Sequence, residues 1–197
     1  MAVTDTLRRI EETGVVPVVR AASGDEALAV VDAIRAGGVD VIELTMTVPG
    51  AVDVIRELSK GCGDQVLVGA GTVLDAETAR ACMLAGARFV VSPIVEVVRA
   101  WQAGAAMVKV FPCHAVGGAS YVKALKAPLP QIPLVPTGGV TLENVGDFIH
   151  AGAVAVGAGA DLADVKKVRA GAVAEVSERA RRYVKAIEQA RAGQPRT

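Results

Sequence analysis

The sequence AGGVDVIEL at residues 36–44 is one of four similar stretches in this chain. The others are AGARFVVS at 85–92, AGAAMVKVF at 103–111 and AGAVAVGAG at 151–159. In each, small residues with a glycine close a stretch of helical periodicity, and an apolar run follows at once. Glycine adopts the left-handed conformation that ends many helices. The recurrence therefore predicts a repeated helix–strand unit.

The same alternation extends over the rest of the chain. Strands are predicted for short β-branched runs at 15–19, 39–44, 66–69, 89–91, 107–111, 134–137 and 154–156. Helices are predicted at 25–36, 51–60, 76–85, 95–103, 119–126, 142–150 and 164–190, with a shorter one at the start. Strands that alternate with helices pair in parallel through right-handed crossovers, either in an open doubly wound sheet or in a closed barrel.

The positions of the glycine-rich turns favour the barrel. A dinucleotide-binding sheet needs a GxGxxG turn that opens its first helix, whereas the glycine-rich turns here come late, at 138–139 and 157–159. Phosphate sites in (β/α)8 barrels are built from the loops after the last two strands. We therefore predict an α/β fold, a TIM-type (β/α)8 barrel of which seven strands are evident. It forms a single domain over 1–197 with a loose tail at 193–197.

The composition argues against several classes of function. The 21 basic and 21 acidic residues balance, and no long run of either sign is present, so a nucleic-acid partner is not expected. Neither a signal peptide nor an apolar stretch of membrane-spanning length is evident, which predicts a cytoplasmic protein without a membrane partner. The three cysteines show no CxxC spacing, which indicates reduced thiols and no structural metal site.

Lys109 is the only charged residue in the apolar run 105–112, which otherwise predicts a buried strand. A buried ammonium without a partner is costly, so this lysine is paired, reaches water at a strand end, or is neutral and reactive. Strand alternation places Lys109 on one face with Met107 and Phe111. The reactive state would make the protein an enzyme.

Glu43 is predicted to face the same interior. Its neighbours Ile42 and Leu44 point the other way along the strand and need helices to cover them. Glu43 and Lys109 both lie toward the carboxyl ends of their strands, where barrel enzymes place their chemistry. They form a plausible catalytic pair, and a purely structural ion pair in the barrel interior is the alternative that periodicity leaves open.

Two glycine-rich turns follow consecutive predicted strands. Thr137, Gly138 and Gly139 precede a predicted helix whose first turn would offer free N–H groups to an anion. Gly159 and Ala160 follow the next strand and could close the site from the other side. The simpler explanation is a pair of tight turns with glycines chosen for positive φ. Because two such turns occur on consecutive strands, we favour a phosphate site.

Six motifs occur in the order seen in 2-keto-3-deoxy-6-phosphogluconate aldolases, a family that includes 4-hydroxy-2-oxoglutarate and phosphogalactonate-type aldolases. They are VVPVVR at 15–20, GGV at 37–39 with IELT at 42–45, GAGTV at 69–73, VSP at 91–93, VKVFP at 108–112 and PTGGV at 136–140. The chain resembles this family from about residue 15 to residue 162. The resemblance implies a class I aldolase with a (β/α)8 fold, usually trimeric, that needs no metal or organic cofactor.

The resemblance also implies roles for individual residues. Lys109 matches the Schiff-base position and Glu43 the acid/base position. Substrate would be a 2-oxo acid, probed most simply by pyruvate, and cleavage of a 2-keto-3-deoxy-6-phospho sugar acid would give pyruvate and an aldehyde such as glyceraldehyde 3-phosphate. The carboxylate of the substrate is assigned to Arg20, Thr72 and Pro93, and its phosphate to Thr137, Gly138, Gly139, Gly159 and Ala160.

The chain departs from the family pattern in three places. Thr47 replaces an arginine found in many members, and Ala160 replaces a serine that often helps to hold phosphate, which leaves an unphosphorylated aldehyde open. After Pro93 one βα unit of roughly 25 residues is absent. The loss of a strand predicts either an open wall beside Lys109 or a narrower, rearranged barrel.

Two other readings of the sequence remain. An engineered or degenerate aldolase-derived scaffold or assembly subunit, with impaired or no catalysis, would also carry these motifs. A phosphate-binding barrel enzyme similar to thiamine phosphate synthase is disfavoured by the buried lysine of VKVFP. A Schiff base on Lys109 is the chemistry that separates the aldolase from both.

Overall fold

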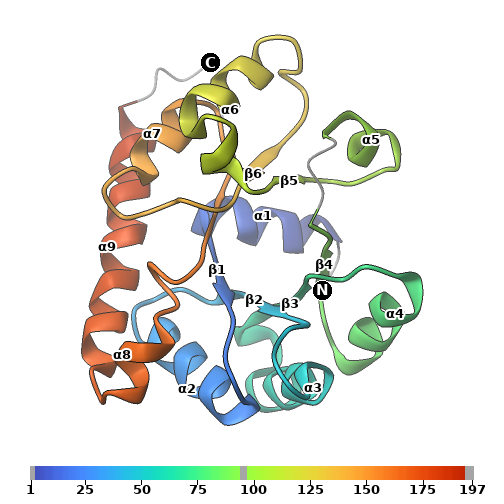
Figure 1. The fold of residues 1–197 in the computed structure, drawn as a ribbon, viewed down its shortest axis with the longest axis vertical. Coiled ribbons are helices and arrows are strands. Elements are labelled where there is room, and N and C mark those ends of the chain that lie inside the picture. The colour runs from blue at the N-terminus through green and yellow to red at the C-terminus, as the bar shows by residue number, and fades with distance from the viewer. Residues whose placement is uncertain (1–2, 94–96, 194–197) are drawn as a thin grey trace.

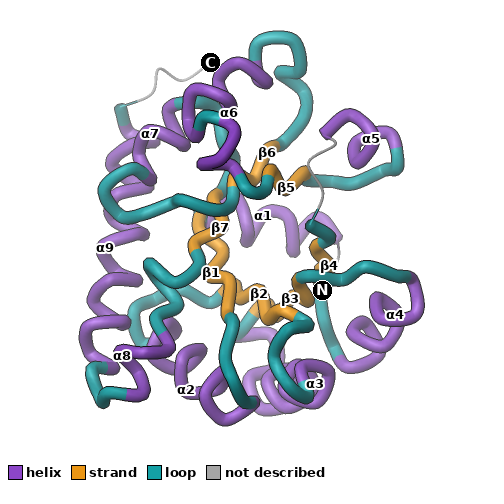
Figure 2. The backbone as a smooth tube through the Cα atoms, in the orientation of Figure 1, coloured by secondary structure: helices purple, strands orange, loops and turns teal. Residues whose placement is uncertain are grey.

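Parallel strands arranged around a common axis form the centre of the molecule, as Figures 1 and 2 show. The computed structural model describes residues 3–93 and 97–193. Its seven strands in the described ranges are β1 (Val15–Val19), β2 (Val41–Thr45), β3 (Leu67–Gly71), β4 (Phe89–Val91), β5 (Val108–Val110), β6 (Leu134–Pro136) and β7 (Val156–Ala158). The predicted strands and the observed strands agree in number and order. The majority of strand ends differ by one or two residues from the predicted ends.

The strands form a five-stranded sheet, in the order β4-β3-β2-β1-β7, and a separate pair, β5-β6. A single parallel bridge between Thr137, just after β6, and Gly157 of β7 connects the two. Register is continuous across the larger sheet, with Glu43 beside Val18 on one side and beside Gly69 on the other. The arrangement is that of a TIM-type barrel, interrupted between β4 and β5.

Helices cover the outside of this ring of strands (Figure 1). Their bounds are α1 (Val3–Thr13), α2 (Gly24–Arg35), α3 (Ala51–Cys62), α4 (Ala76–Ala85), α5 (Val97–Gln102), α6 (Gly118–Lys126), α7 (Val145–His150), α8 (Val165–Arg169) and α9 (Val173–Ala192). Two short 3-10 helices, η1 (Gly63–Gln65) and η2 (Cys113–Val116), precede β3 and α6. None of the described helices is long and apolar enough to cross a membrane.

The two faces of the strands pack into different apolar clusters. Ile42 and Leu44 belong to the large cluster between strands and outer helices. Val41, by contrast, packs with Ile10 of α1 and Met107 in a smaller cluster inside the ring. This confirms the predicted alternation, because residues of one strand at odd and even positions point to opposite sides. Helix α1 closes one end of the interior through Ile10.

The four repeated stretches end their helices with left-handed glycines, as predicted. Gly38, Gly86, Gly104 and Gly152 have φ values of +87°, +109°, +90° and +96°. At Gly86 the backbone N–H also closes the end of α4 by donating to carbonyls of the preceding turn. A side chain at these positions would strain the backbone, and at Gly86 a Cβ atom would also lie 2.5 Å from Oγ of Ser59.

Two predicted helix boundaries were wrong. The long helix expected at 164–190 is two helices, α8 and α9, because Gly171 between them has a φ of +80°. The helix expected from 142 begins at Val145, after a turn in which the amides of Asn144 and Val145 both donate to the carbonyl of Thr141. The helix expected at 95–103 is described from Val97 onward. Residues 95–96 of it, and 194–197 of the predicted tail, lie outside the described residues.

The loss of one βα unit left two possibilities, an open wall beside Lys109 or a narrower closed barrel. The interruption between β4 and β5 distinguishes between them. Within 3–93 and 97–193, β4 pairs only with β3, and β5 pairs only with β6. A short helix, α5, occupies the connection between them. The wall beside Lys109 is therefore open, and the narrower closed barrel is not formed.

Candidate active site

Lys109 and Glu43 meet inside the barrel although β5 and β2 belong to different sheets. The Nζ atom of Lys109 lies 2.9 Å from Oε1 and 3.2 Å from Oε2 of Glu43. Only 9% of the lysine side chain and 4% of the glutamate side chain are exposed. The lysine also lies over the ring of Phe111, 5.8 Å from its centroid. Of the three states considered for a lysine in this strand, the structure contains the paired one.

A buried ion pair of this kind has a limited value for stability. Removing two charges from water costs several kcal/mol each, about as much as their attraction returns. Two well-packed apolar side chains could fill the same space at no loss. The pair is able, however, to exchange a proton, and a lysine that passes its proton to Glu43 becomes a neutral amine nucleophile. The geometry thus suits covalent chemistry on a carbonyl group.

Gly71 of β3 provides the space in which the Glu43 carboxylate lies. A Cβ atom at Gly71 would be 2.1 Å from Oε1 and 2.6 Å from Cδ of Glu43. Real atoms do not approach so closely, so any side chain here would move the carboxylate. Because Glu43 is itself buried, it has little room to retreat.

We expect Gly71→Ala to lower the rate of any reaction that uses Glu43 by about 10²-fold, the cost of displacing a catalytic group by about 1 Å. Overpacking should also reduce the free energy of unfolding by roughly 1–3 kcal/mol. Steady-state kinetics and urea unfolding measure the two effects. Gly61→Ala is the matched control, since a Cβ at Gly61 in α3 meets nothing within 4 Å. Equal activity of the two variants would contradict this role of Gly71.

A cavity of about 310 Å³ leads to the pair. Its wall is mainly apolar and includes Ile10, Val16, Phe89 and Met107. Residues of β4 and of the segment before β5 both line it, so it lies along the interruption of the barrel wall. A small organic acid therefore has room beside Lys109. The full lining is Leu7, Ile10, Val16, Glu43, Phe89, Val90, Val91, Ser92, Ala100, Ala105, Ala106, Met107, Val108, Lys109, Val135, Thr137 and Gly157.

Arg20, Thr72 and Pro93, the residues predicted for a substrate carboxylate, lie outside this cavity as the described residues define it. Arg20 follows β1 and is exposed, with Nη1 3.9 Å from the place a Cβ on Gly159 would occupy. It therefore lies beside the second glycine-rich turn. Pro93 follows β4 and is half-buried. A carboxylate role for these residues stays a prediction.

Thr72 carries a signal that the sequence does not reveal. It has a φ of +61°, and it is the one non-glycine residue with positive φ in the part of the chain that the structure describes. A β-branched residue in this region is strained by about 1–3 kcal/mol. Such strain is typical of functional sites, and Thr72 directly follows the strand that contacts Glu43.

The first glycine-rich turn has the backbone that its sequence predicts. Gly138 and Gly139 have φ values of +89° and +78°, so both need glycine. Their backbone N–H groups find no acceptor among residues 3–93 and 97–193, which leaves them available to an anion. Thr137 is buried and packs against Gly157, where a Cβ would be 2.2 Å from its hydroxyl. The expected helix N-terminus is not at this turn, because α7 begins later, at Val145.

The second glycine-rich turn is simpler. Gly159 and the exposed Ala160 follow β7, and neither has a positive φ. The backbone N–H of Ala160 also has no acceptor within the described ranges. The explanation by positive φ thus holds for the first turn and fails for the second. Both turns lie at the same end of the barrel, after β6 and β7.

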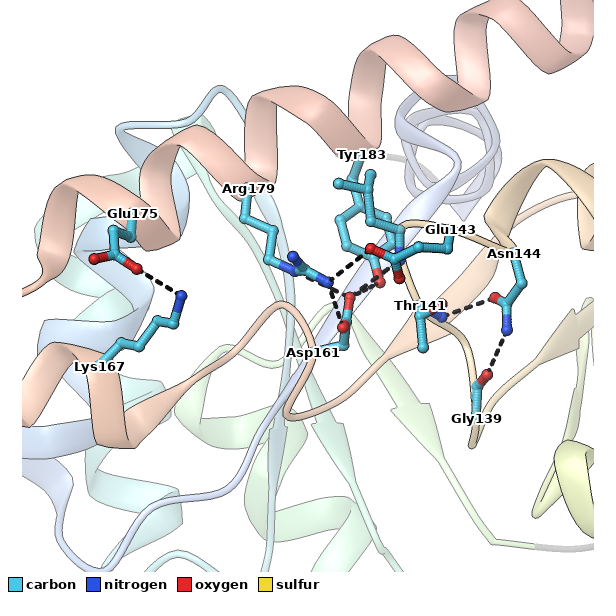
Figure 3. Close-up of polar contacts among 10 residues, drawn as sticks. Gly139, Thr141, Glu143, Asn144, Asp161, Lys167, Glu175, Arg179 and Tyr183 are labelled. Carbon is cyan, nitrogen blue, oxygen red and sulfur yellow. Dashed lines mark hydrogen bonds and ion pairs between the residues drawn. The ribbon is translucent and has the colours of Figure 1, made fainter.

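Asp161 is a residue that the sequence reasoning missed. Its carboxylate accepts hydrogen bonds from Arg179 and Tyr183 of α9 and from the amide of Leu142 (Figure 3). Burial would raise the pKa of Asp161, but the hydrogen bonds from Arg179 and Tyr183 and the charge of Arg179 hold the pKa below its usual range. The carboxylate is therefore ionised at neutral pH. An acidic residue directly after a glycine-rich turn was the available signal.

No group of three or more His, Cys, Asp or Glu side chains that could hold a metal ion occurs within residues 3–93 and 97–193.

The sequence profile of the KDPG and KHG aldolase family matches residues 6–98 and 94–179. The 2-dehydro-3-deoxy-6-phosphogalactonate aldolase of Escherichia coli (strain K12) is 35% identical over 200 aligned positions, which cover 89% of this chain and 95% of the relative. The 2-dehydro-3-deoxy-phosphogluconate aldolase of Treponema pallidum (strain Nichols) is 30% identical, with 85% of this chain and 90% of the relative covered.

A solved structure is similar over nearly the same extent. The KDPG aldolase of Legionella pneumophila, captured with pyruvate as a covalent carbinolamine, superposes with a TM-score of 0.81 at 25% identity. The superposition covers 89% of this chain and 96% of the other.

The comparisons agree with the missing unit. The alignment with the E. coli relative spans 200 positions. This chain contributes 89% of its 197 residues, about 175, so about 25 aligned positions of the relative have no counterpart in this chain. The two matched segments of the family profile meet at 94–98, between β4 and α5. This is where the sequence predicts the loss and where the barrel wall is open.

Proposed function

Since this chain belongs to the KDPG and KHG aldolase family and is a lyase, we propose that it cleaves a 2-keto-3-deoxy sugar acid through a Schiff base on Lys109. The products are pyruvate and an aldehyde, and no metal or organic cofactor takes part. The observation that carries the proposal is the buried contact of 2.9 Å between Lys109 and Glu43, beside a cavity of small-molecule size. A scaffold without catalysis has no need for this pair.

The first step is attack on the substrate. Glu43 accepts a proton from the Lys109 ammonium, and the neutral amine adds to the C2 keto carbon to give a carbinolamine. Glu43 returns this proton to the carbinolamine hydroxyl, which leaves as water, so the C2–N bond becomes a protonated imine and Glu43 is again a carboxylate. The Legionella pneumophila enzyme, which holds pyruvate as a carbinolamine, supports this step.

The second step breaks the carbon–carbon bond. Glu43, directly or through a water, removes the proton of the C4 hydroxyl; the C3–C4 electron pair moves into the imine, and the aldehyde leaves. The remaining enamine is protonated at C3 by the same carboxyl group, and water hydrolyses the imine to release pyruvate. Glu43 is close enough for these transfers because it already contacts Nζ.

We propose which residues bind the two ends of the substrate. Arg20, Thr72 and Pro93 hold the C1 carboxylate, and the backbone amides of the glycine-rich turns hold a 6-phosphate, with Thr137, Gly138, Gly139, Gly159 and Ala160 as its site. Free N–H groups at Gly138, Gly139 and Ala160, as far as the described chain extends, support the phosphate.

Borohydride reduction in the presence of pyruvate tests the proposal. A stable adduct should form, and mass spectrometry of a digest should locate it on the peptide that contains Lys109. Cleavage of the 6-phosphorylated gluconate and galactonate acids, followed through pyruvate release, then identifies the substrate. EDTA should leave the rate unchanged. If Lys109 acquires no adduct, the aldolase proposal is wrong and the scaffold is favoured.

We also propose a homotrimer in the cytoplasm, where the free thiols of Cys62, Cys82 and Cys113 would stay reduced. An apolar surface supports assembly. The large apolar residues of this surface lie in or next to α4, β4 and α5, and at least a third of the area of each is exposed. They are Leu74, Met83, Leu84, Val90, Val98 and Trp101.

Light scattering should give three times the chain mass for the unmodified protein. Leu84→Glu should dissociate it, because a charge would enter an apolar contact at a side chain that is 76% exposed in the single chain. Val173→Glu, at an exposed apolar residue of α9, is the matched control and should remain a trimer. A monomeric unmodified protein would contradict the assembly.

A further inference from the structure

We propose that Asp161 is a positioning residue that fixes the two glycine-rich turns relative to each other and so sets the preference for a phosphorylated substrate. The inference rests on the proposed function. Asp161 does not touch the reacting atoms; it acts through the backbone amides of the turns.

One carboxylate connects three segments of the chain. Its Oδ2 atom accepts from the amide of Leu142, in the loop after β6, at 3.1 Å. The same atom accepts from Nε of Arg179 at 3.1 Å and from the hydroxyl of Tyr183, while Oδ1 accepts from the second guanidinium nitrogen. Asp161 itself lies in the loop after β7. Both glycine-rich turns are thereby attached to α9 (Figure 3).

The connection continues from Leu142 to the first turn. Thr141 donates its amide to Oδ1 of Asn144 at 2.8 Å, and Nδ2 of Asn144 donates to the carbonyl of Gly139 at 2.9 Å. The carbonyl of Gly139 is therefore fixed, which sets the orientation of the peptide that follows it. The contacts from Asp161 therefore hold the chain that directly follows Gly139. The peptide that carries the Gly139 amide is held from the other side, where the amide of His114 donates to the carbonyl of Gly138 at 3.1 Å.

The charge of Asp161 is compensated within the cluster. Arg179 forms an ion pair with it and also lies 3.7 Å from Glu143. Tyr183 is completely buried, so its hydroxyl would lose its partner if the carboxylate were removed. Because Arg179 neutralises the carboxylate, Asp161 can stand next to an anion site without repelling the anion. A neutral amide in its place could not accept all of these bonds.

The test compares Asp161→Asn with the unmodified full-length protein. A hydrogen bond to a charged group is worth enough to change binding by about 10- to 100-fold. KM for the 6-phosphorylated acid and the inhibition constant of inorganic phosphate should both rise by about that factor. Turnover of the unphosphorylated acid, and formation of the pyruvate adduct on Lys109, should change by less than about twofold.

Two further variants keep the test decisive if Asp161→Asn folds poorly. Tyr183→Phe removes one hydrogen bond and keeps the ring, so it should shift the same constants in the same direction by a smaller factor. Glu175→Gln, also on α9, removes the exposed ion pair with Lys167 of α8 and should change none of these constants.

The possible outcomes separate the two claims. Equal losses on the phosphorylated and unphosphorylated acids in Asp161→Asn and Tyr183→Phe would mean a structural role only and would overturn the inference, as would an unmodified protein with no preference for phosphate. A protein without any pyruvate adduct on Lys109 would instead refute the proposed function itself.

Discussion

Lys109→Met is expected to lower kcat for aldol cleavage at least about 10⁴-fold, because methionine has similar length but no amine to form the imine. No borohydride-trapped adduct with pyruvate should form. The variant also leaves Glu43, with 4% of its side chain exposed, without its cation, so we expect reduced stability, by about 3–5 kcal/mol if Glu43 remains charged. Pyruvate release measures the rate, and thermal unfolding measures the stability.

Two controls make the result for Lys109 specific. Lys123→Met replaces an exposed lysine of α6 and should keep full activity. The double variant Lys109→Met with Glu43→Gln should recover much of the stability without activity, because the buried charge is gone. Retention of cleavage within tenfold in Lys109→Met would show that another group performs the chemistry.

Glu43→Gln should reduce cleavage by about 10²–10⁴-fold, the usual contribution of a positioned acid or base. The amide keeps the shape of the side chain and can still lie against Gly71, but it cannot accept a proton. Pyruvate should still form an adduct with Lys109, more slowly. Exchange of the pyruvate methyl protons with deuterium, followed by NMR, should decrease by the same factor as cleavage because both require proton transfer at C3.

For Glu43→Gln, the comparison between adduct formation and proton exchange shows whether Glu43 transfers protons. Glu57→Gln, at an exposed glutamate of α3, serves as the control and should leave exchange and cleavage unchanged. If Glu43→Gln exchanges methyl protons at the unmodified rate, Glu43 orients Lys109 without transferring protons, and the acid/base role passes to another group.

Local signals in the sequence predict the features that depend on neighbouring residues alone. Positive φ at Gly38, Gly86, Gly104 and Gly152 follows from glycine after a helix. The inward direction of Glu43 follows from the two-residue period of a strand, and with the strand order of a barrel it is enough to anticipate the contact with Lys109.

Features that depend on distant partners could not be predicted in this way. Asp161 gains its role from side chains 18 and 22 positions away on α9, whose placement requires the finished fold. Whether the loss of a strand opens or narrows the barrel is likewise decided by packing over the whole ring.

The interruption between β4 and β5 gives the sheet two ends, which a closed barrel does not have. An interior strand such as β1 or β2 must break two rows of hydrogen bonds to separate, whereas β4 and β5 each have one row to break among the described residues. Amide exchange with solvent therefore proceeds from these ends toward β1 and β2. We therefore expect Lys109, the proposed nucleophile, to lie on a strand that opens early, and Glu43, its proposed proton acceptor, to lie on a strand that opens late.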